Sequence, residues 1–211
     1  MSRIPGLFAC GECAAGINGA NRLGGNSLSD LLVLGKRAGE FAAKYAQEHP
    51  AGQVSNDQVE EAERWALHFM DAPLGEENPY LVQEALQDLM QDLVGIVRKE
   101  DEMLRALEGI GQLWVRARKA RAPGNREYNP GWHTAMDLPN LLTVSEAVTR
   151  SALLRKESRG GHFRDDFQQK VPAFGNVNFV VRKDSDGEMK VTSRPIPEMP
   201  AELKQIIEEM K

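Results

Sequence analysis

The spacing of apolar residues along the chain predicts a mainly helical protein. Apolar side chains recur every three or four positions through residues 56–70, 79–97, 100–117 and 134–156, which is the period of an amphipathic helix. The same reasoning predicts an earlier helix over residues 27–47. Amphipathic helices with short connections pack side by side, so we expect three or four of them to form a helical bundle.

The apolar stripes of these helices identify the expected core. We interpret their Met and Trp positions as packing positions, and the acidic first turns at residues 60–63 and 100–102 as complements to the helix dipole. Pro139 either bends the last of these helices or marks its start. The stripes are Val59, Ala62, Trp65, Ala66, Phe69 and Met70; Val82, Ala85, Leu86, Leu89, Leu93 and Val97; Met103, Leu104, Leu107, Ile110, Trp114 and Ala117; and Leu141, Val144, Val148 and Ala152.

The N-terminal stretch has a different pattern. An apolar run at residues 7–10, between two glycines, predicts a buried strand that delivers Glu12 at its end. A glycine-rich turn follows, and Asn26 and Ser27 are residue types that begin helices. A helix N-terminus after such a loop favours negative charge: phosphate, carboxylate or the anionic edge of a reduced flavin.

Two side chains of this stretch add candidate chemistry. The guanidinium of Arg22 matches a carboxylate in two hydrogen bonds, and the carboxylate of Glu12 accepts hydrogen bonds from sugar-like hydroxyls. These residues predict an anion and polyol site. A tight strand-to-helix connection without a ligand explains the same residues about as well.

The C-terminal part of the chain predicts β structure. Apolar and polar residues alternate over residues 177–181 and 189–193, and residues 184–187 have turn composition, so we expect a β-hairpin. Three prolines then precede a short helix over residues 201–210.

Composition limits the classes of partner. The 211 residues include 26 basic and 31 acidic side chains, and the resulting net charge of −5 argues against nucleic acid. No apolar run approaches the roughly 18 residues of a membrane span, and no signal peptide is visible. We therefore expect a cytoplasmic protein, at most peripheral to a membrane. Basic residues at positions 116–121 suit a helix C-terminus better than a phosphate site.

Cys10 and Cys13 have the spacing of a redox pair or of half a zinc site. Zinc needs about four ligands, and the four histidines are isolated in the sequence. We therefore expect no metal site and interpret Cys10 as a small core residue.

Two motifs carry a family resemblance. The sequence GLFACGE followed by GANRLGGNSLSD resembles the second part of the FAD-binding domain in the flavoprotein subunit of succinate dehydrogenase and fumarate reductase. SRGGHFRDDF, at residues 158–167, resembles a later motif of that family. The resemblance extends to about residue 170. L-Aspartate oxidases have a similar loop, usually without the Leu-Gly-Gly of residues 23–25, so the dehydrogenase and reductase branch is favoured.

This resemblance implies roles for five residues. It implies that Arg22 holds a carboxylate of succinate or fumarate, and that Glu12 hydrogen-bonds the ribityl chain of FAD or groups near it. Asn26, Ser27 and Leu28 would bind the flavin at the helix start, with the amides of the last two at its pyrimidine edge. The proton-donating arginine and the dinucleotide motif of the family precede this stretch, so we expect no catalytic residue here.

The resemblance also implies a larger assembly. We expect the C-terminal part of a longer flavoprotein that passes electrons to an iron–sulfur subunit, at the inner face of the cell membrane through other subunits. The fragment alone is expected to be inactive. Two alternatives stay open: a non-catalytic helical module that docks on partners, and a related FAD oxidase such as L-aspartate oxidase.

Residues 158–167 allow two interpretations. Two arginines, one histidine and two aspartates are crowded beside two glycines, as in an acid/base or anion site. We favour a salt-bridged loop that pins the bundle to the flavin domain, in which Arg159 and His162 support the site without chemistry. The predicted domains are therefore an FAD-binding piece (1–50), a helical bundle (51–157) and a junction loop with hairpin and terminal helix (158–211).

Overall fold

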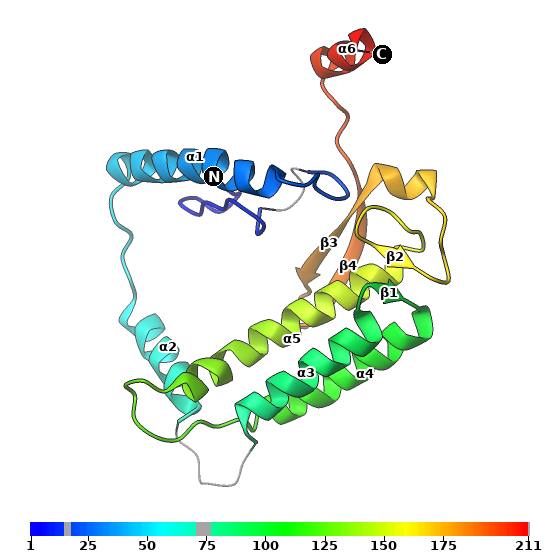
Figure 1. Cartoon of the computed structure of the whole chain (residues 1–211). Coiled ribbons are helices and arrows are strands. Elements are labelled where there is room, and N and C mark those ends of the chain that lie inside the picture. The colour runs from blue at the N-terminus through cyan, green and yellow to red at the C-terminus, as the bar shows by residue number, and fades with distance from the viewer. Residues whose placement is uncertain (15–17, 71–76, 211) are drawn as a thin grey trace. The chain divides into compact units, whose positions relative to one another are not determined.

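The computed structural model describes residues 1–14, 18–70 and 77–210 (Figure 1). The chain divides into two compact units, Met1–Leu67 and His68–Lys211, and each is considered by itself. The domain limits at residues 50 and 157 stay predictions. The mainly helical fold with a C-terminal hairpin is confirmed, and its elements are α1 Asn26–Glu48, α2 Asn56–His68, α3 Pro79–Val94, β1 Val97–Arg98, α4 Glu100–Ala117, α5 Pro130–Leu154, β2 Phe163–Arg164, η1 Pro172–Asn176, β3 Val177–Lys183, β4 Met189–Pro195 and α6 Ala201–Glu209.

Three helices of the second unit, α3, α4 and α5, pack against one another as a bundle (Figure 1). Asn78 caps α3, since its side-chain oxygen accepts a hydrogen bond from the Tyr80 amide at 3.0 Å. Side chains from all three helices form one core cluster: Val82, Leu86, Ile110, Leu113, Ala117, Ala120, Leu138 and Leu142. A second cluster, nearer the other end of the bundle, contains Val94, Met103, Ala106 and Ala152.

The expected stripes are correct for most positions of α3 and α4, whereas in α5 only Ala152 is buried as expected. Val144 is 61% exposed and Leu141 and Val148 are more than a third exposed, although all three were expected in the core. The other buried residues of α5 are Ala135, Leu138, Leu142 and Thr149. This helix is apolar around most of its circumference, so the spacing of its residues fits two neighbouring faces.

Smaller corrections concern four other positions. Val97 was expected in the helix over residues 79–97, but it lies in β1, after the end of α3, and Leu104 is half exposed. In α2, which buries none of its own residues, Val59 and Trp65 are about half exposed. The stripe residue just after α2, Phe69, is buried as expected.

The start of α5 also differs from expectation. The helix predicted over residues 134–156 begins earlier, because residues 129–133 are its cap and first turn. The Asn129 side chain accepts from the Trp132 amide at 3.0 Å, and Pro130 occupies the first turn. Pro139 lies inside the helix. The helix continues through this proline because Leu138 and Leu142 on either side are fully buried in the core.

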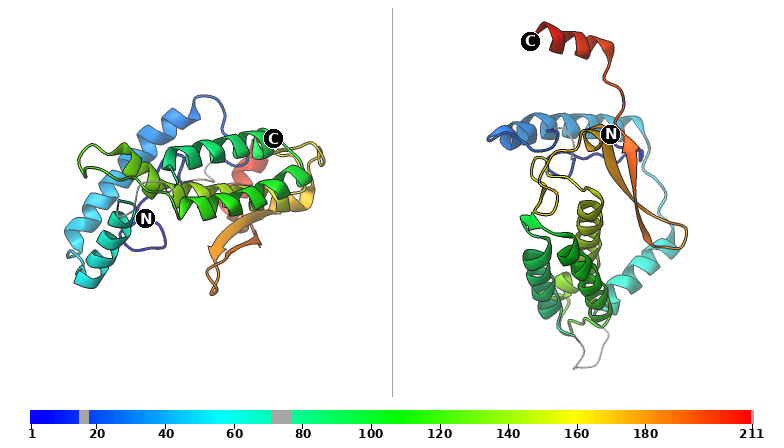
Figure 2. Two further views of the ribbon diagram at one scale, coloured as in Figure 1. Left: turned by 90° about the horizontal axis from the view of Figure 1, so that it is seen from below. Right: turned by 90° about the vertical axis from the view of Figure 1, so that its right-hand side faces the viewer.

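Two small sheets complete the second unit. β1 and β2 pair in parallel, Val97 with Phe163 and Arg98 with Arg164, which joins the α3–α4 connection to the segment after α5. β3 and β4 form the predicted hairpin, which lies against α5 (Figure 2). The helix predicted over residues 201–210 is confirmed as α6.

The strand expected at residues 7–10 is absent. The Leu7 amide donates to the carbonyl of Ile4 at 3.1 Å, and its own carbonyl accepts from Ser2 at 2.8 Å, so this segment forms turns, and Leu7 is half exposed. A strand needs a ladder partner, and no described residue pairs with this segment. Within the described residues, no helix combines the length and apolar character that crossing a bilayer requires.

Candidate functional site

The first unit contains a cavity of about 610 Å³ beside the start of α1. It brings together Glu12, Arg22 and Ser27, three of the five residues implicated by the sequence. Asn26 and Leu28 begin the same helix and are not among the lining residues. The remaining lining residues are Gly11, Ala14, Asn18, Gly19, Ala20, Asn21, Asp30 and Leu31.

Helix α1 supports both sides of this cavity. Gly11 has φ +75° and lies so close to α1 that a Cβ atom there would come within 2.9 Å of Leu31 Cδ2. On the other side, Asn18 Nδ2 donates a 2.6 Å hydrogen bond to Asp30 Oδ2. The two anchors are consecutive residues of α1, so one turn of the helix sets the spacing of the segments that carry Glu12 and Arg22.

The helix start differs in detail from expectation. The N-cap is Gly25, in a left-handed conformation with φ 86° and no side-chain cap, so a cap by Asn26 or Ser27 is wrong. The amides of Asn26 and Leu28 donate to Leu23 and Gly25 carbonyls at 3.2 and 3.1 Å. Among the first three helical amides, that of Ser27 therefore has no acceptor in the described part of the chain.

The charges around the cavity suit one carboxylate. Outside residues 15–17, 71–76 and 211, no ion pair engages the guanidinium of Arg22, which is exposed at the cavity. Glu12 and Asp30 are the acidic residues of the lining, and Asp30 is engaged by Asn18. The arrangement offers one bidentate cation, one helix amide and one carboxylate acceptor for hydroxyls.

Sequence reasoning missed Asn18 and Asp30 as lining residues. The available signal was helical spacing: Asp30 lies one turn after Ser27, on the face of α1 that is partly buried at Ser27, Asp30, Leu34, Ala38 and Tyr45.

The two cysteines lie outside the cavity lining. Cys13 is exposed and its thiol donates to the carbonyl of Cys10 at 3.2 Å, while Cys10 is partly buried, and both are free thiols. Among the described residues, no group of three or more His, Cys, Asp and Glu side chains could hold a metal ion.

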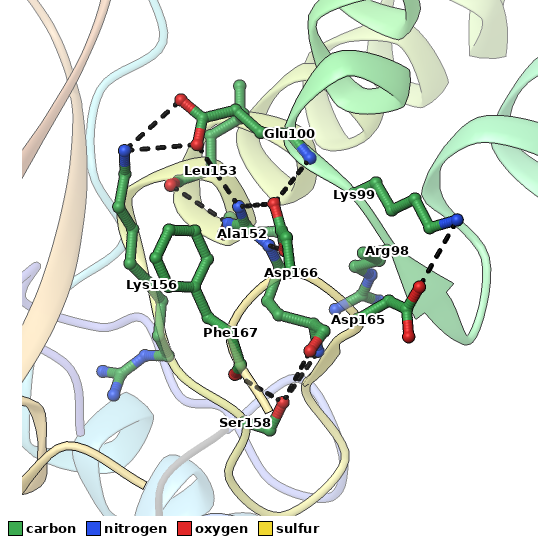
Figure 3. A network of polar contacts seen from close by, with 12 residues as sticks. Arg98, Lys99, Glu100, Ala152, Leu153, Lys156, Ser158, Asp165, Asp166 and Phe167 are labelled. Atoms are coloured by element: carbon green, nitrogen blue, oxygen red, sulfur yellow. Dashed lines mark hydrogen bonds and ion pairs between the residues drawn. The ribbon is translucent and has the colours of Figure 1, made fainter. Parts of the chain in front are cut away.

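The motif at residues 158–167 forms a network of polar contacts that includes Ser158, Asp166 and Glu100 (Figure 3). Its central residue is Arg164, whose side chain is completely buried. Its guanidinium donates to both oxygens of Asp166 at 2.7 Å, and to the carbonyls of Ala152 and Leu153 at 2.9 and 3.2 Å. Asp166 also accepts from the Glu100 amide at 2.9 Å. The Arg164–Asp166 pair therefore provides hydrogen-bond partners both for carbonyls in the last turn of α5 and for the first amide of α4.

Hydrogen bonds from Arg164, and to a lesser extent from the Glu100 amide, hold the pKa of Asp166 at about 2 against the opposing effect of burial. A carboxylate with this pKa stays ionised at neutral pH and does not serve as a general acid or base there.

Glu157 is the centre of a second cluster and is also completely buried. Its carboxylate accepts from Arg155 at 2.7 Å, from Arg159 at 2.8 and 3.0 Å, and from the Val171 amide at 2.8 Å. The hydrogen bonds from Arg159 are the largest cause of a pKa lowered to about 2, against the effect of burial.

His162 lies between two arginines. Arg98 Nη1 is 3.0 Å from His162 Nδ1, and His162 Nε2 is 3.0 Å from the carbonyl of Arg155. Since the arginine can only donate, Nδ1 is the acceptor and Nε2–H the donor of a neutral ring. Burial lowers the pKa of His162, and the charges of Arg98, Arg164 and Arg155 lower it further.

The geometry of residues 155–171 is that of a salt-bridged loop. Each acidic group of the two clusters is held by arginine or backbone donors, which favours the structural interpretation over an acid/base site. A contact of this loop with a flavin domain stays a prediction. Two of the basic residues at positions 116–121 are also held by protein groups, since Arg116 pairs with Glu77 at 2.9 Å and Arg121 donates to the carbonyls of Arg118 and Ala120.

Comparison with known proteins decides the family. The sequence profile of the fumarate reductase flavoprotein C-terminal domain matches residues 83–206, more than half of the chain, and the profile of an FAD-binding domain matches residues 1–28. The chain belongs to the fumarate reductase flavoprotein family. It corresponds to the C-terminal portion of the succinate dehydrogenase and fumarate reductase flavoprotein subunits, as the resemblance predicted.

Individual relatives agree with this assignment. The fumarate reductase flavoprotein subunit of Mycobacterium tuberculosis is 35% identical over 201 residues, covering 92% of this chain and 34% of that protein. The succinate dehydrogenase flavoprotein subunit of Coxiella burnetii is 37% identical over 179 residues, covering 81% of this chain and 29% of that protein.

A solved structure, the Mycobacterium smegmatis Sdh1 complex in the apo form, superposes with a TM-score of 0.84 at 44% identity, covering 92% of this chain and 34% of that one. This chain therefore spans about a third of the length of the relatives it matches.

Proposed function

We propose that this chain is the C-terminal portion of a flavoprotein that interconverts succinate and fumarate. The observation that carries the proposal is the cavity at the start of α1, where Arg22, Glu12 and the Ser27 amide lie together in the segment that matches an FAD-binding domain. Family membership supports the proposal, because relatives are named as succinate dehydrogenase and fumarate reductase flavoprotein subunits.

In this proposal Arg22 binds and orients one substrate carboxylate. Its guanidinium can donate two parallel hydrogen bonds, which fix both the position and the plane of a carboxylate. Glu12 accepts hydrogen bonds from hydroxyls of the FAD ribityl chain, and the Ser27 amide donates to the flavin edge that carries negative charge on reduction. FAD, when bound, supplies the hydride-transfer chemistry. The positions of Asn26 and Leu28 beside Ser27 make them further cofactor contacts of the same proposal.

The fit of these residues is partial. The cavity contributes one unpaired arginine, whereas succinate and fumarate each carry two carboxylates. Its lining also includes two acidic residues, which disfavour a second anion. The proposal therefore requires that another cation hold the second carboxylate, and that a separate segment hold the FAD diphosphate, because this sequence contains no Gly-x-Gly-x-x-Gly motif.

We further propose an iron–sulfur subunit as the electron partner, with peripheral attachment to the inner face of the cell membrane through other subunits. The Sdh1 match supports this, since that structure is a complex. The cavity also suits a related FAD oxidase that acts on an amino-acid dicarboxylate, and a succinate-against-aspartate substrate test separates the two. A purely non-catalytic helical module is the remaining alternative.

The experiment is Arg22→Ala in a full-length flavoprotein subunit that carries this sequence. We expect the KM for succinate or fumarate to rise by about a hundredfold, because a bidentate charge-assisted pair is lost, while the flavin content is retained. Arg37→Ala is the matched control, because Arg37 is an exposed arginine in α1, the helix that follows the Arg22 loop. An Arg22→Ala enzyme with normal kinetics in the artificial-acceptor assay would refute the carboxylate role.

A further inference from the structure

Asp30 is placed where it can control the position of the Arg22 loop. It lies in the second turn of α1, it is partly buried, and it lines the cavity together with Arg22. Its Oδ2 atom accepts the 2.6 Å hydrogen bond from Asn18 Nδ2, across twelve positions of sequence. A hydrogen bond to a charged acceptor at this distance is among the stronger kinds in proteins.

The loop that carries Arg22 has few other anchors. The Arg22 amide donates to the side chain of Asn21 at 2.9 Å, and the Asn26 amide donates to Leu23, so these contacts hold the loop only to itself. In the described part of the loop, the bond from Asn18 to Asp30 is the side-chain hydrogen bond that ties it to the body of α1.

The opposite wall of the cavity is fixed by Leu31, the residue that follows Asp30 in α1. Gly11 packs directly on Leu31, so the segment carrying Glu12 is registered against the same helical turn. With one wall fixed at Leu31 and the other at Asp30, the separation of Glu12 and Arg22 depends on both contacts.

We propose that Asp30 is a positioning residue, which holds the loop of residues 18–22 on α1 so that the Arg22 guanidinium faces the cavity. Its effect on substrate binding rests on the function proposed above for Arg22, whereas its effect on the loop does not. Asp30 touches no reacting atom in this proposal, so its removal weakens carboxylate binding more than the chemical step.

The first test measures the loop in this chain without substrate. Trypsin cleaves after Arg22, and mass spectrometry follows the rate at that bond. We expect Asp30→Ala to raise this rate about tenfold, since loop opening becomes easier, and Asp30→Asn, which keeps an acceptor oxygen, to lie near the wild type. Glu40→Ala is the matched control, because Glu40 is an exposed acid of α1 that pairs with Lys36 at 3.7 Å. Cleavage after Arg37 reports whether α1 itself has unfolded.

The second test measures kinetics in the full-length subunit. Asp30→Ala should raise the KM for the dicarboxylate about tenfold with kcat and flavin content nearly unchanged, and Asp30→Asn should restore most of the loss. An unchanged rate of cleavage after Arg22 in Asp30→Ala overturns the inference. An unchanged KM in Asp30→Ala, where Arg22→Ala raises it, also overturns the inference. An unchanged KM in both variants instead overturns the function proposed for Arg22, and the cleavage rate alone then decides whether Asp30 holds the loop.

Discussion

Replacement of Glu157 by glutamine tests how the loop after α5 is held. The carboxylate is completely buried and receives four hydrogen bonds, from two arginines and the Val171 amide. Glu157→Gln keeps the shape of the side chain, replaces one acceptor oxygen with an NH₂ group and removes the negative charge. At least one arginine donor would then face another donor, and both guanidinium charges would lose their counter-ion.

The structure gives the size of the effect. The pKa of Glu157 falls from an ordinary 4.5 to about 2. One pKa unit corresponds to about 1.4 kcal/mol, so the charged form is favoured in the folded state by about 3 kcal/mol. We expect Glu157→Gln to lose about that much free energy of unfolding at pH 7. Since the pKa of Glu157 is lowered in the folded state, this contribution to stability is complete above pH 4.5 and disappears as the pH falls toward 2. The free energies of unfolding of the wild type and of Glu157→Gln should therefore become similar in acid.

The assay is urea unfolding at pH 7 and at pH 3.5, followed by circular dichroism, with hydrogen exchange of the amides at residues 155–171 as a local probe. Glu146→Gln is the matched control: it removes a Glu–Arg pair one helical turn apart on α5, whose arginine side chain is 40% exposed. This control should lose at most about 0.5 kcal/mol. If Glu157→Gln were no more destabilising than Glu146→Gln, the argument that Glu157 holds this loop would be wrong.

Two further predictions address the core and the response to pH. Leu142→Ala should lower the free energy of unfolding in urea by about 2–5 kcal/mol, because Leu142 is 0% exposed. Val144→Ala should lower it by less than about 0.5 kcal/mol, because Val144 is 61% exposed. Equal losses would refute the assignment of the buried face of α5. The pKa of His162 is lowered below its ordinary 6.5, so the unfolded chain binds the proton more readily and stability should fall as the pH drops below about 6.5. His162→Gln should flatten the unfolding free energy between pH 5 and 7, and an unchanged slope would contradict this.

Local signals in the sequence were sufficient for most of the fold. Helix starts such as Pro79 and Glu100, and the hairpin with its turn at residues 184–187, were predicted because caps, prolines, first-turn charges and alternation act over a few neighbouring residues. The family motifs around Glu12 and Arg22 identified the segment that forms the cavity, for the same reason: its glycines, N-cap residue types and arginine lie within one short stretch.

The tertiary structure decided what depends on distant partners. Leu141 and Leu142 are equivalent by composition, and only the packing of α3 and α4 selects which of them is buried. The run at residues 7–10 had the composition of a strand, but strand formation needs a ladder partner.

The roles of charged residues were decided in the same way. The charge partners of Arg164 and Glu157 lie only two residues away, in keeping with the predicted salt-bridged loop. Their complete burial could not be predicted, because the backbone groups that complete their hydrogen bonds come from the end of α5 and from the segment before β3. From the sequence, Asp30 has the character of a helix surface residue. It lines the cavity because the chain brings Asn18, twelve positions earlier, into hydrogen-bond contact with it. The sequence by itself determined the elements, the motifs and the family. The tertiary structure decided burial and side-chain pairing, because these depend on contacts between residues far apart in the chain.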